Sequence, residues 1–221
     1  GESTVELVGV ASSVILSGGS EAAGANLALP ETVTYESADY ALASIGAYAF
    51  YLSGATDVTL PASVGNVDDR AFRSSDVARV EVDQANPFYS SYDGALYDAT
   101  RSSLLLIPGG RNGAVRVPDT ATSVPASAFS HCAGVSAIAV DEGSPAFSSW
   151  DGSLYDADGT TLLRVPAGAT EIIIRDGCTT IAAGAMEACA ELTTINAPAS
   201  VTSISPDAFH AIPTVSLPVA S

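Results

Sequence analysis

The chain contains no lysine, and charged residues make up only 15% of its 221 residues. Its eight cationic residues are all arginines, and it has 25 acidic residues, so the formal net charge is −17. Nucleic acids and anionic membrane surfaces bind basic patches, and this composition offers little to build one. We therefore expect no nucleic-acid partner. The acidity favours a basic partner or a divalent cation, but it is also typical of an acidic surface that only contacts water.

Cysteine is scarce as well. Cys132, Cys178 and Cys189 are too few for a disulfide framework. Each falls at a position of the repeat described below that is predicted to point inward, where a free cysteine behaves as a small buried hydrophobe. A reactive or metal-binding thiol is the alternative interpretation.

Long apolar runs are also missing. A membrane-spanning helix needs about 20 apolar residues, and aliphatic stretches such as residues 104–107 are far shorter. We therefore expect no membrane insertion by this segment. The chain begins with Gly1 rather than methionine, which we interpret as a mature or truncated segment whose signal peptide is not visible.

Aromatic residues are few, at 7%, although hydrophobic residues in total reach 47%. Disordered chains show the opposite balance of apolar and charged residues, so most of this chain should fold. Alanine, serine, threonine and valine are abundant. Small and β-branched residues suit the thin turns of a stacked β structure.

A six-residue signature recurs five times: an aliphatic residue, three variable residues, alanine and a large apolar residue. The copies are residues 45–50, 67–72, 124–129, 181–186 and 204–209. Their final residues lie 22, 57, 57 and 23 positions apart along the chain. Such periods are typical of solenoids, in which each unit buries its apolar face against its neighbours. The predicted repeat core comprises the three cysteines and the final residues Phe50, Phe72, Phe129, Met186 and Phe209.

Short runs with apolar residues two apart, such as Val80 and Val82, follow the signatures, and proline marks corners near them. These runs are too short for helices and are typical of strands. The predicted fold is a β-rich solenoid in one domain over residues 1–221. Residues 1–40 are less regular and are predicted to form an atypical N-terminal cap, with the repeats at 41–221.

Both long steps contain a near-duplicate segment with an Asp-Gly pair between extended flanks. The two copies are residues 86–98 and 144–156. Asp-Gly in this setting is the strongest short-range hairpin signal. Each copy is therefore predicted to be a β-hairpin insert followed by one more strand. The sequence leaves open whether a long unit forms one enlarged coil or two.

The repeat resembles the BspA-type leucine-rich repeat, a family of bacterial cell-surface leucine-rich repeat proteins. Residues 128–138 and 185–204 carry the resemblance, through Ala-Phe or Ala-Met followed at fixed spacings by cysteine, an aliphatic residue and isoleucine. It extends over roughly residues 29–221, with departures such as Ser75 and Arg175. The resemblance implies a BspA-like leucine-rich repeat array in a surface-exposed or secreted bacterial protein. Several relatives are linked to adhesion, including binding of host matrix proteins, although function depends on sites rather than folds.

No catalytic constellation is recognisable, so we predict no catalytic residue, no cofactor, no metal site and no enzyme activity. Residues 156–159 begin like a calcium loop but lack the later ligands, and turn chemistry explains their Asp-Gly pair. A second acidic group could attract a cation but is also typical of a solvated face; it comprises Asp68, Asp69, Asp76 and Asp83.

Tyr92 and Trp150 occupy the same position in the two hairpins, just before the turn. Exposed aromatic residues are favoured contact anchors, so both are candidate ligand contacts. Packing within the hairpin is the alternative use.

The leading hypothesis is a non-catalytic, extracellular or cell-surface interaction module that binds a protein or glycan on an extended face, in adhesion. One alternative is a structural stalk or spacer, and another is a polysaccharide-active enzyme on a β-helix. The sequence determines neither the ligand nor the oligomeric state.

Overall fold

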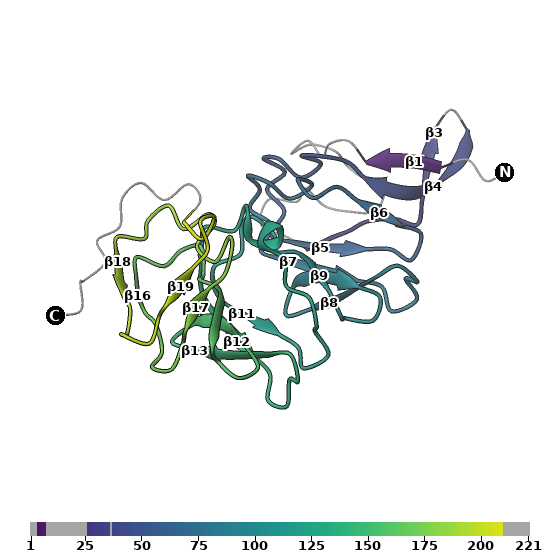
Figure 1. Ribbon diagram of the computed structural model, residues 1–221. Coiled ribbons are helices and arrows are strands. Elements are labelled where there is room, and N and C mark those ends of the chain that lie inside the picture. The colour runs from purple at the N-terminus through teal and green to yellow at the C-terminus, as the bar shows by residue number, and fades with distance from the viewer. Residues whose placement is uncertain (1–3, 8–25, 36, 210–221) are drawn as a thin grey trace. The chain divides into compact units, whose positions relative to one another are not determined.

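The computed structural model describes residues 4–7, 26–35 and 37–209 (Figure 1). The chain divides into two compact units, residues 1–111 (unit 1) and residues 112–221 (unit 2). Regular structure in the described residues is almost entirely β, with one short 3₁₀ helix, η1 (Ala126–Phe129), as the exception. This is the β-rich architecture that the repeat predicts. A single solenoid domain over residues 1–221 stays a prediction.

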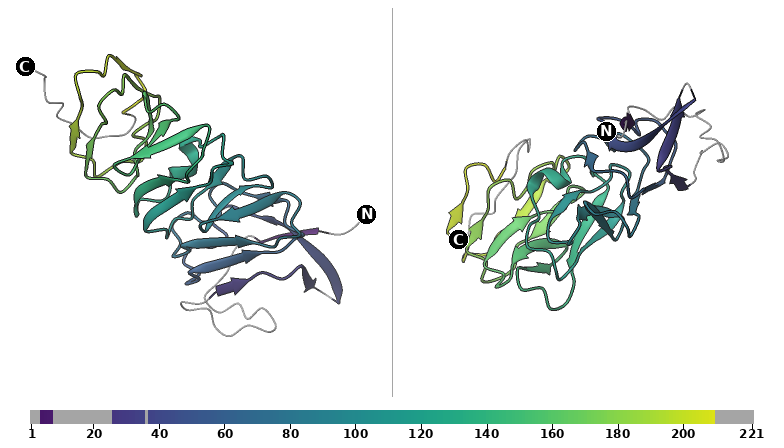
Figure 2. Two further views of the ribbon diagram at one scale, coloured as in Figure 1. Left: turned by 90° about the horizontal axis from the view of Figure 1, so that it is seen from below. Right: turned by 90° about the vertical axis from the view of Figure 1, so that its right-hand side faces the viewer.

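Unit 1 is built from short strands, drawn in purple, blue and teal in Figure 2. They are β1 (Thr4–Leu7), β2 (Asn26–Ala28), β3 (Thr32–Tyr35), β4 (Ala38–Ile45), β5 (Asp57–Leu60), β6 (Asn66–Val67), β7 (Arg79–Val82), β8 (Tyr89–Tyr92), β9 (Ala95–Asp98) and β10 (Leu104–Leu106). β1 and β6 pair with β4 in parallel, whereas β3 pairs with it antiparallel.

The ladder β2–β5–β7 shows how successive coils stack in unit 1. All of its strands are parallel, with Leu27 opposite Val58 and Val58 opposite Val80. Val58, Leu60 and Val80 are fully buried, because alternate side chains of a strand point to the same face. Each coil therefore contributes one short strand whose apolar side chains enter a shared core.

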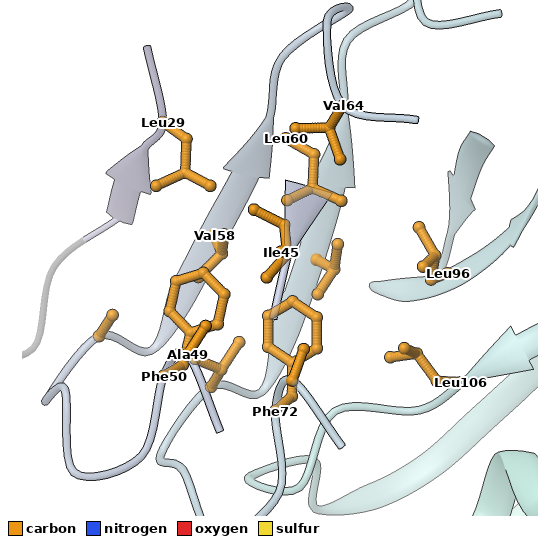
Figure 3. Packing of buried hydrophobic residues seen from close by; sticks show 14 of the residues in the cluster. Leu29, Ile45, Ala49, Phe50, Val58, Leu60, Val64, Phe72, Leu96 and Leu106 are labelled. Carbon is orange, nitrogen blue, oxygen red and sulfur yellow. The ribbon is translucent and has the colours of Figure 1, made fainter. Parts of the chain in front are cut away.

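The final residues of the first two signatures, Phe50 and Phe72, lie in turns that follow β4 and β6. Phe50 and Phe72 are buried, and their rings stack with centroids 4.8 Å apart (Figure 3). The main chain is aligned in the same way: the Tyr48 amide donates to the Arg70 carbonyl, and the Phe50 amide donates to the Ala71 carbonyl. Two copies 22 residues apart thus repeat the same geometry in consecutive coils.

Unit 2 repeats this plan with its own strands. They are β11 (Gly113–Val117), β12 (Val135–Val140), β13 (Phe147–Trp150), β14 (Ser153–Asp156), β15 (Thr161–Arg164), β16 (Glu171–Ile173), β17 (Thr180–Ile181), β18 (Thr194–Asn196) and β19 (Ser203–Ile204). β11 pairs with β12, and β16 pairs with β18. β15 pairs with β17, and β17 pairs in turn with β19. All of these pairs are parallel.

The core of unit 2 also contains signature residues. Phe129 and Met186 are buried, and the partly buried Phe209 packs against the cluster that contains Met186. The Met186 amide donates to the Ala208 carbonyl, which matches the Phe50–Ala71 bond in unit 1. Cys178 and Cys189 belong to the same apolar cluster.

The long step in unit 2 contains two turns of the coil. Leu162 on β15 pairs in parallel with Ile181 on β17, so a complete coil lies between the turns that carry Phe129 and Met186. In this additional coil, Arg164 is the residue that lies next to Phe129, with its guanidinium 5.9 Å from the centroid of the Phe129 ring. The question that the sequence left open is thereby answered for this unit.

Both Asp-Gly segments form antiparallel hairpins, β8–β9 and β13–β14, and each continues into a third antiparallel strand, β10 or β15. Asp93 and Asp151 both have φ of 49°, and the glycines after them also have positive φ, as a type I′ turn requires. Each tip docks on a neighbouring strand: Val80 donates to the Gly94 carbonyl, and Ile138 to the Gly152 carbonyl. That these hairpins are inserts in a shorter family repeat stays a prediction.

The N-terminal region includes β1, which extends the sheet of β4 by parallel pairing. Residues 1–3 and 8–25, which make up much of the predicted cap at 1–40, lie outside the described residues. The capping role therefore stays a prediction.

Replacement of a signature residue tests this packing. We expect Phe129→Ala to lower the free energy of unfolding by about 3–5 kcal/mol, because the ring is buried and its removal leaves a cavity. Thermal and denaturant unfolding would measure the loss. The exposed Ser127→Ala in the same turn is the control, with an expected change within about 0.5 kcal/mol. Equal effects of the two substitutions would show that the assigned register is wrong.

Candidate functional site

The turn that resembles a calcium loop is held by one carboxylate. Asp156 accepts hydrogen bonds from the Thr160 amide, the Thr160 hydroxyl and the Thr161 amide, at 2.7–3.0 Å. Asp98 accepts equivalent bonds from Ser102 and Ser103 in the other copy. Among the described residues, no group of three histidine, cysteine or carboxylate side chains could hold a metal ion. Through their hydrogen bonds, these two carboxylates anchor the turns between β9 and β10 and between β14 and β15.

These hydrogen bonds change the acidity of both groups. Partial burial acts to raise the pKa of Asp98 and Asp156, but the hydrogen bonds from neighbouring amides and hydroxyls outweigh it. The pKa of each carboxyl is consequently lower than its ordinary value of 3.8. A group whose pKa is depressed on folding contributes stability above its unfolded pKa, and this contribution is lost as the pH falls through the folded pKa.

A pH series tests this turn chemistry. We expect the double variant Asp98→Asn/Asp156→Asn to melt at a lower temperature than the wild type at pH 7. The difference should shrink as the pH falls below 3.8, because protonation removes the wild-type advantage. The exposed Asp158→Asn is the matched control, with little effect at any pH. A difference in melting temperature that does not vary with pH would contradict the assignment.

The three cysteines are buried, as the repeat register predicts. Burial raises the pKa of Cys132 and of Cys189 to about 12, so both are protonated thiols at neutral pH. The Cys132 thiol donates to the Phe129 carbonyl at 3.3 Å. Protonated, buried thiols are poor nucleophiles and poor metal ligands, so Cys132 and Cys189 support packing rather than thiol chemistry.

The acidic group at Asp68, Asp69, Asp76 and Asp83 does not act as one cluster. Asp68 and Asp69 pair with Arg70, at 3.2 and 3.4 Å. The hydrogen bond from Arg70 is the main reason that the pKa of Asp68 is lowered. Asp83 instead accepts a bond from the Ala85 amide at 2.8 Å within its own turn. Local turns and one arginine therefore account for three of the four carboxylates.

Arg164 is a buried cation that the sequence reasoning missed. It is 4% exposed, its Nη1 donates to the Gly184 carbonyl, and its Nε has no hydrogen-bond partner. Burial lowers the pKa of this guanidinium. The corresponding residue in the first hairpin segment is Leu106, which is also buried. The signal in the sequence is the arginine that replaces the leucine of the first copy at this position.

Replacing Arg164 by its counterpart tests whether the cation stabilises the core. We expect Arg164→Leu to leave the free energy of unfolding unchanged or to raise it by up to about 4 kcal/mol, with a melting temperature that is equal or higher, because an apolar side chain avoids the desolvation of a buried charge. The reciprocal Leu106→Arg in unit 1 should be destabilising. A clear fall in the melting temperature of Arg164→Leu would show instead that its contacts with Phe129 and Gly184 outweigh desolvation.

The hairpin tips bring the two candidate contact residues into different surroundings. Tyr92 is half-buried, meets the buried Tyr97 edge-to-face at 6.4 Å, and is covered by the guanidinium of Arg101 at 5.9 Å. Trp150 is 39% exposed and stacks on no described ring or cation. The packing alternative thus describes Tyr92, whereas Trp150 has the exposure that a contact residue needs.

A second exposed group lies in the first signature turn of unit 1. Tyr48, Tyr51 and Leu52 are 41%, 52% and 67% exposed. Arg73 donates to the Tyr48 hydroxyl, and its guanidinium lies 5.9 Å from the Tyr48 ring. Tyr48 and Leu52 have positive φ, which is uncommon for bulky residues. The repeat pattern does not identify this group, because Tyr48 fills a variable position of the signature and Tyr51 and Leu52 lie just after it.

Residues 30–106 and 167–219 match the BspA type leucine-rich repeat region family in six copies. Because the match covers more than half of the chain, the chain belongs to this family, as the sequence resemblance indicated. No curated protein matches the sequence. In the described residues, no helix has the length and apolar character needed to cross a bilayer.

Three solved structures are similar to this chain at low sequence identity. The pneumococcal vaccine antigen PcpA shares 14% identity with a TM-score of 0.50, over 89% of this chain and 61% of that chain. A leucine-rich repeat protein from Eubacterium ventriosum shares 19%, with a TM-score of 0.47 over 78% and 50%. A leucine-rich cell surface protein from Faecalibacterium prausnitzii shares 20%, with a TM-score of 0.41 over 87% and 68%. The chain thus spans less than two thirds of the first two structures.

Proposed function

We propose that the protein is a non-catalytic interaction module of the bacterial cell surface or extracellular space, which binds a protein or glycan on an exposed face. The exposed side chain of Trp150 at the tip of the β13–β14 hairpin carries this proposal. Aromatic residues are enriched at binding hot spots because they bury large areas when a partner binds.

Two further observations support binding rather than catalysis. The chain belongs to the BspA type leucine-rich repeat family, whose fold presents surfaces. Several carboxylates are already engaged in turns or ion pairs, as for Asp98, Asp156 and Asp68. The exposed Tyr48, Tyr51 and Leu52 add apolar surface that a plain spacer has no need to expose.

A binding assay with matched variants tests the proposal. We expect the purified chain to bind at least one immobilised extracellular-matrix protein or arrayed glycan in a saturable manner. Trp150→Ala should weaken this binding by about tenfold, because loss of an anchor residue typically costs more than 1 kcal/mol. Tyr92→Ala, at the equivalent half-buried position, is the control, and surface plasmon resonance would measure both. The absence of any saturable ligand would favour the structural stalk instead.

A further inference from the structure

The two hairpins are duplicate scaffolds 58 residues apart in the sequence. Each has Asp-Gly at the turn with positive φ at both residues, and each tip accepts a hydrogen bond from the preceding strand, β7 or β12. The strands next to them match as well: Val82 donates to the Ser91 hydroxyl, and Val140 donates to the Ser149 hydroxyl. Differences in surface chemistry between the tips therefore arise from side chains on a common backbone.

The tip of the β8–β9 hairpin is covered by cations from its own unit. Arg101 lies over the Tyr92 ring at 5.9 Å. Arg111 forms a 2.6 Å ion pair with Asp93, and only 12% and 23% of these two side chains remain exposed. The ring and the carboxylate thus each contact one guanidinium.

The tip of the β13–β14 hairpin lacks both cations. Gly159 stands where Arg101 is in the first segment, and Ala169 stands where Arg111 is. Trp150 is 39% exposed, and exposed Asp151 has no ion pair with any described residue. Arg175 is a cation elsewhere in this unit, but its guanidinium lies against Gly159 and not over the Trp150 ring.

We propose that Trp150 and Asp151 form a docking site for arginine side chains of a partner protein. The first hairpin supplies the chemical precedent, since its aromatic ring and its aspartate are satisfied by guanidinium groups. Tryptophan is the strongest cation–π ring among the side chains. A guanidinium also fits a carboxylate through paired hydrogen bonds. This inference rests on the proposed binding function and names the class of its ligand.

The charge of the chain favours the same partner. With a net charge of −17, the protein attracts basic surfaces and accelerates their encounter at low salt. A neutral glycan would gain from the Trp150 ring but not from the long-range field. We therefore assign the site to a protein that exposes arginine, and binding of a glycan at this tip is an outcome that would overturn the assignment.

The probe is an acetylated Gly-Arg-Gly-Arg-Gly peptide, and its citrulline counterpart is the uncharged control of nearly equal shape. Trp150 is the only tryptophan in the chain, so its fluorescence reports directly on this tip. We expect the arginine peptide to change the fluorescence in a saturable manner and the citrulline peptide to bind at least about fivefold more weakly. Equal responses to the two peptides would overturn the proposal.

Matched variants separate a local site from general attraction to an acidic protein. Asp151→Asn keeps a residue suited to the turn and should lower the affinity for the arginine peptide about three- to fivefold. Glu191→Gln removes the same charge from another exposed position in unit 2 and should leave the affinity unchanged. Indistinguishable affinities of these two variants would contradict a specific site at Asp151.

Exchanging residues between the hairpins provides a second test. Ala169→Arg should place a cation near Asp151 and lower the affinity for the arginine peptide. Ala190→Arg is the control, because it adds the same charge at an exposed position elsewhere in unit 2. Conversely, Arg101→Gly/Arg111→Ala should uncover the first tip and raise the calorimetric stoichiometry from one peptide to two. Circular dichroism confirms the fold of each variant. If Ala169→Arg leaves the affinity unchanged in a folded protein, the docking assignment is wrong.

The outcomes distinguish this inference from the broader function. A chain that binds a matrix protein or glycan through Trp150, but shows no preference for arginine over citrulline, keeps the proposed function and loses the arginine site. A chain that binds the arginine peptide in an Asp151-dependent manner, but no matrix protein or glycan, keeps the site and loses the expected binding of matrix proteins and glycans.

Discussion

The parallel register between consecutive coils is the constraint on which the rest of the structure depends. A single coil is too thin to enclose a phenylalanine, so Phe50 becomes buried only because Phe72 of the following coil lies against it. The amide–carbonyl bonds from Phe50 to Ala71 and from Met186 to Ala208 fix that register in the main chain. Displacement by one residue would turn the inward strand positions outward, and the core would be lost.

This constraint explains how much of the fold could be predicted from the sequence. The five signature copies predict stacking, because a residue such as Phe72 must reappear at the same place in each coil. The Asp-Gly pairs predict hairpins, because only a few residue types accept positive φ at both central positions, as Asp93 and Gly94 do. Both signals are local or strictly periodic, and the structure bears out the stacking and the antiparallel pairing.

Features that depend on contacts distant in sequence were not predictable in this way. The extra coil before Met186 lacks the Ala-Phe signature, because its inward position is occupied by Arg164. The candidate site posed the same difficulty. Tyr92 and Trp150 are equivalent in the sequence, but Arg101 covers the Tyr92 ring, whereas Gly159 at the matching position has no side chain that could cover Trp150. Position in the repeat predicts the backbone, but not which side chains cover it.

The features that both long units share are those that the backbone requires. Gly110 and Gly168 recur because a side chain at either place would collide with the carbonyl of Asp76 or of Ala133. Asp98 and Asp156 recur because each satisfies the amides of a tight turn. No such requirement applies to the cations around the tips, since water solvates an exposed carboxylate such as Asp151 at little cost to folding. Unit 2 can therefore lack these cations at its tip, where Trp150 and Asp151 remain exposed.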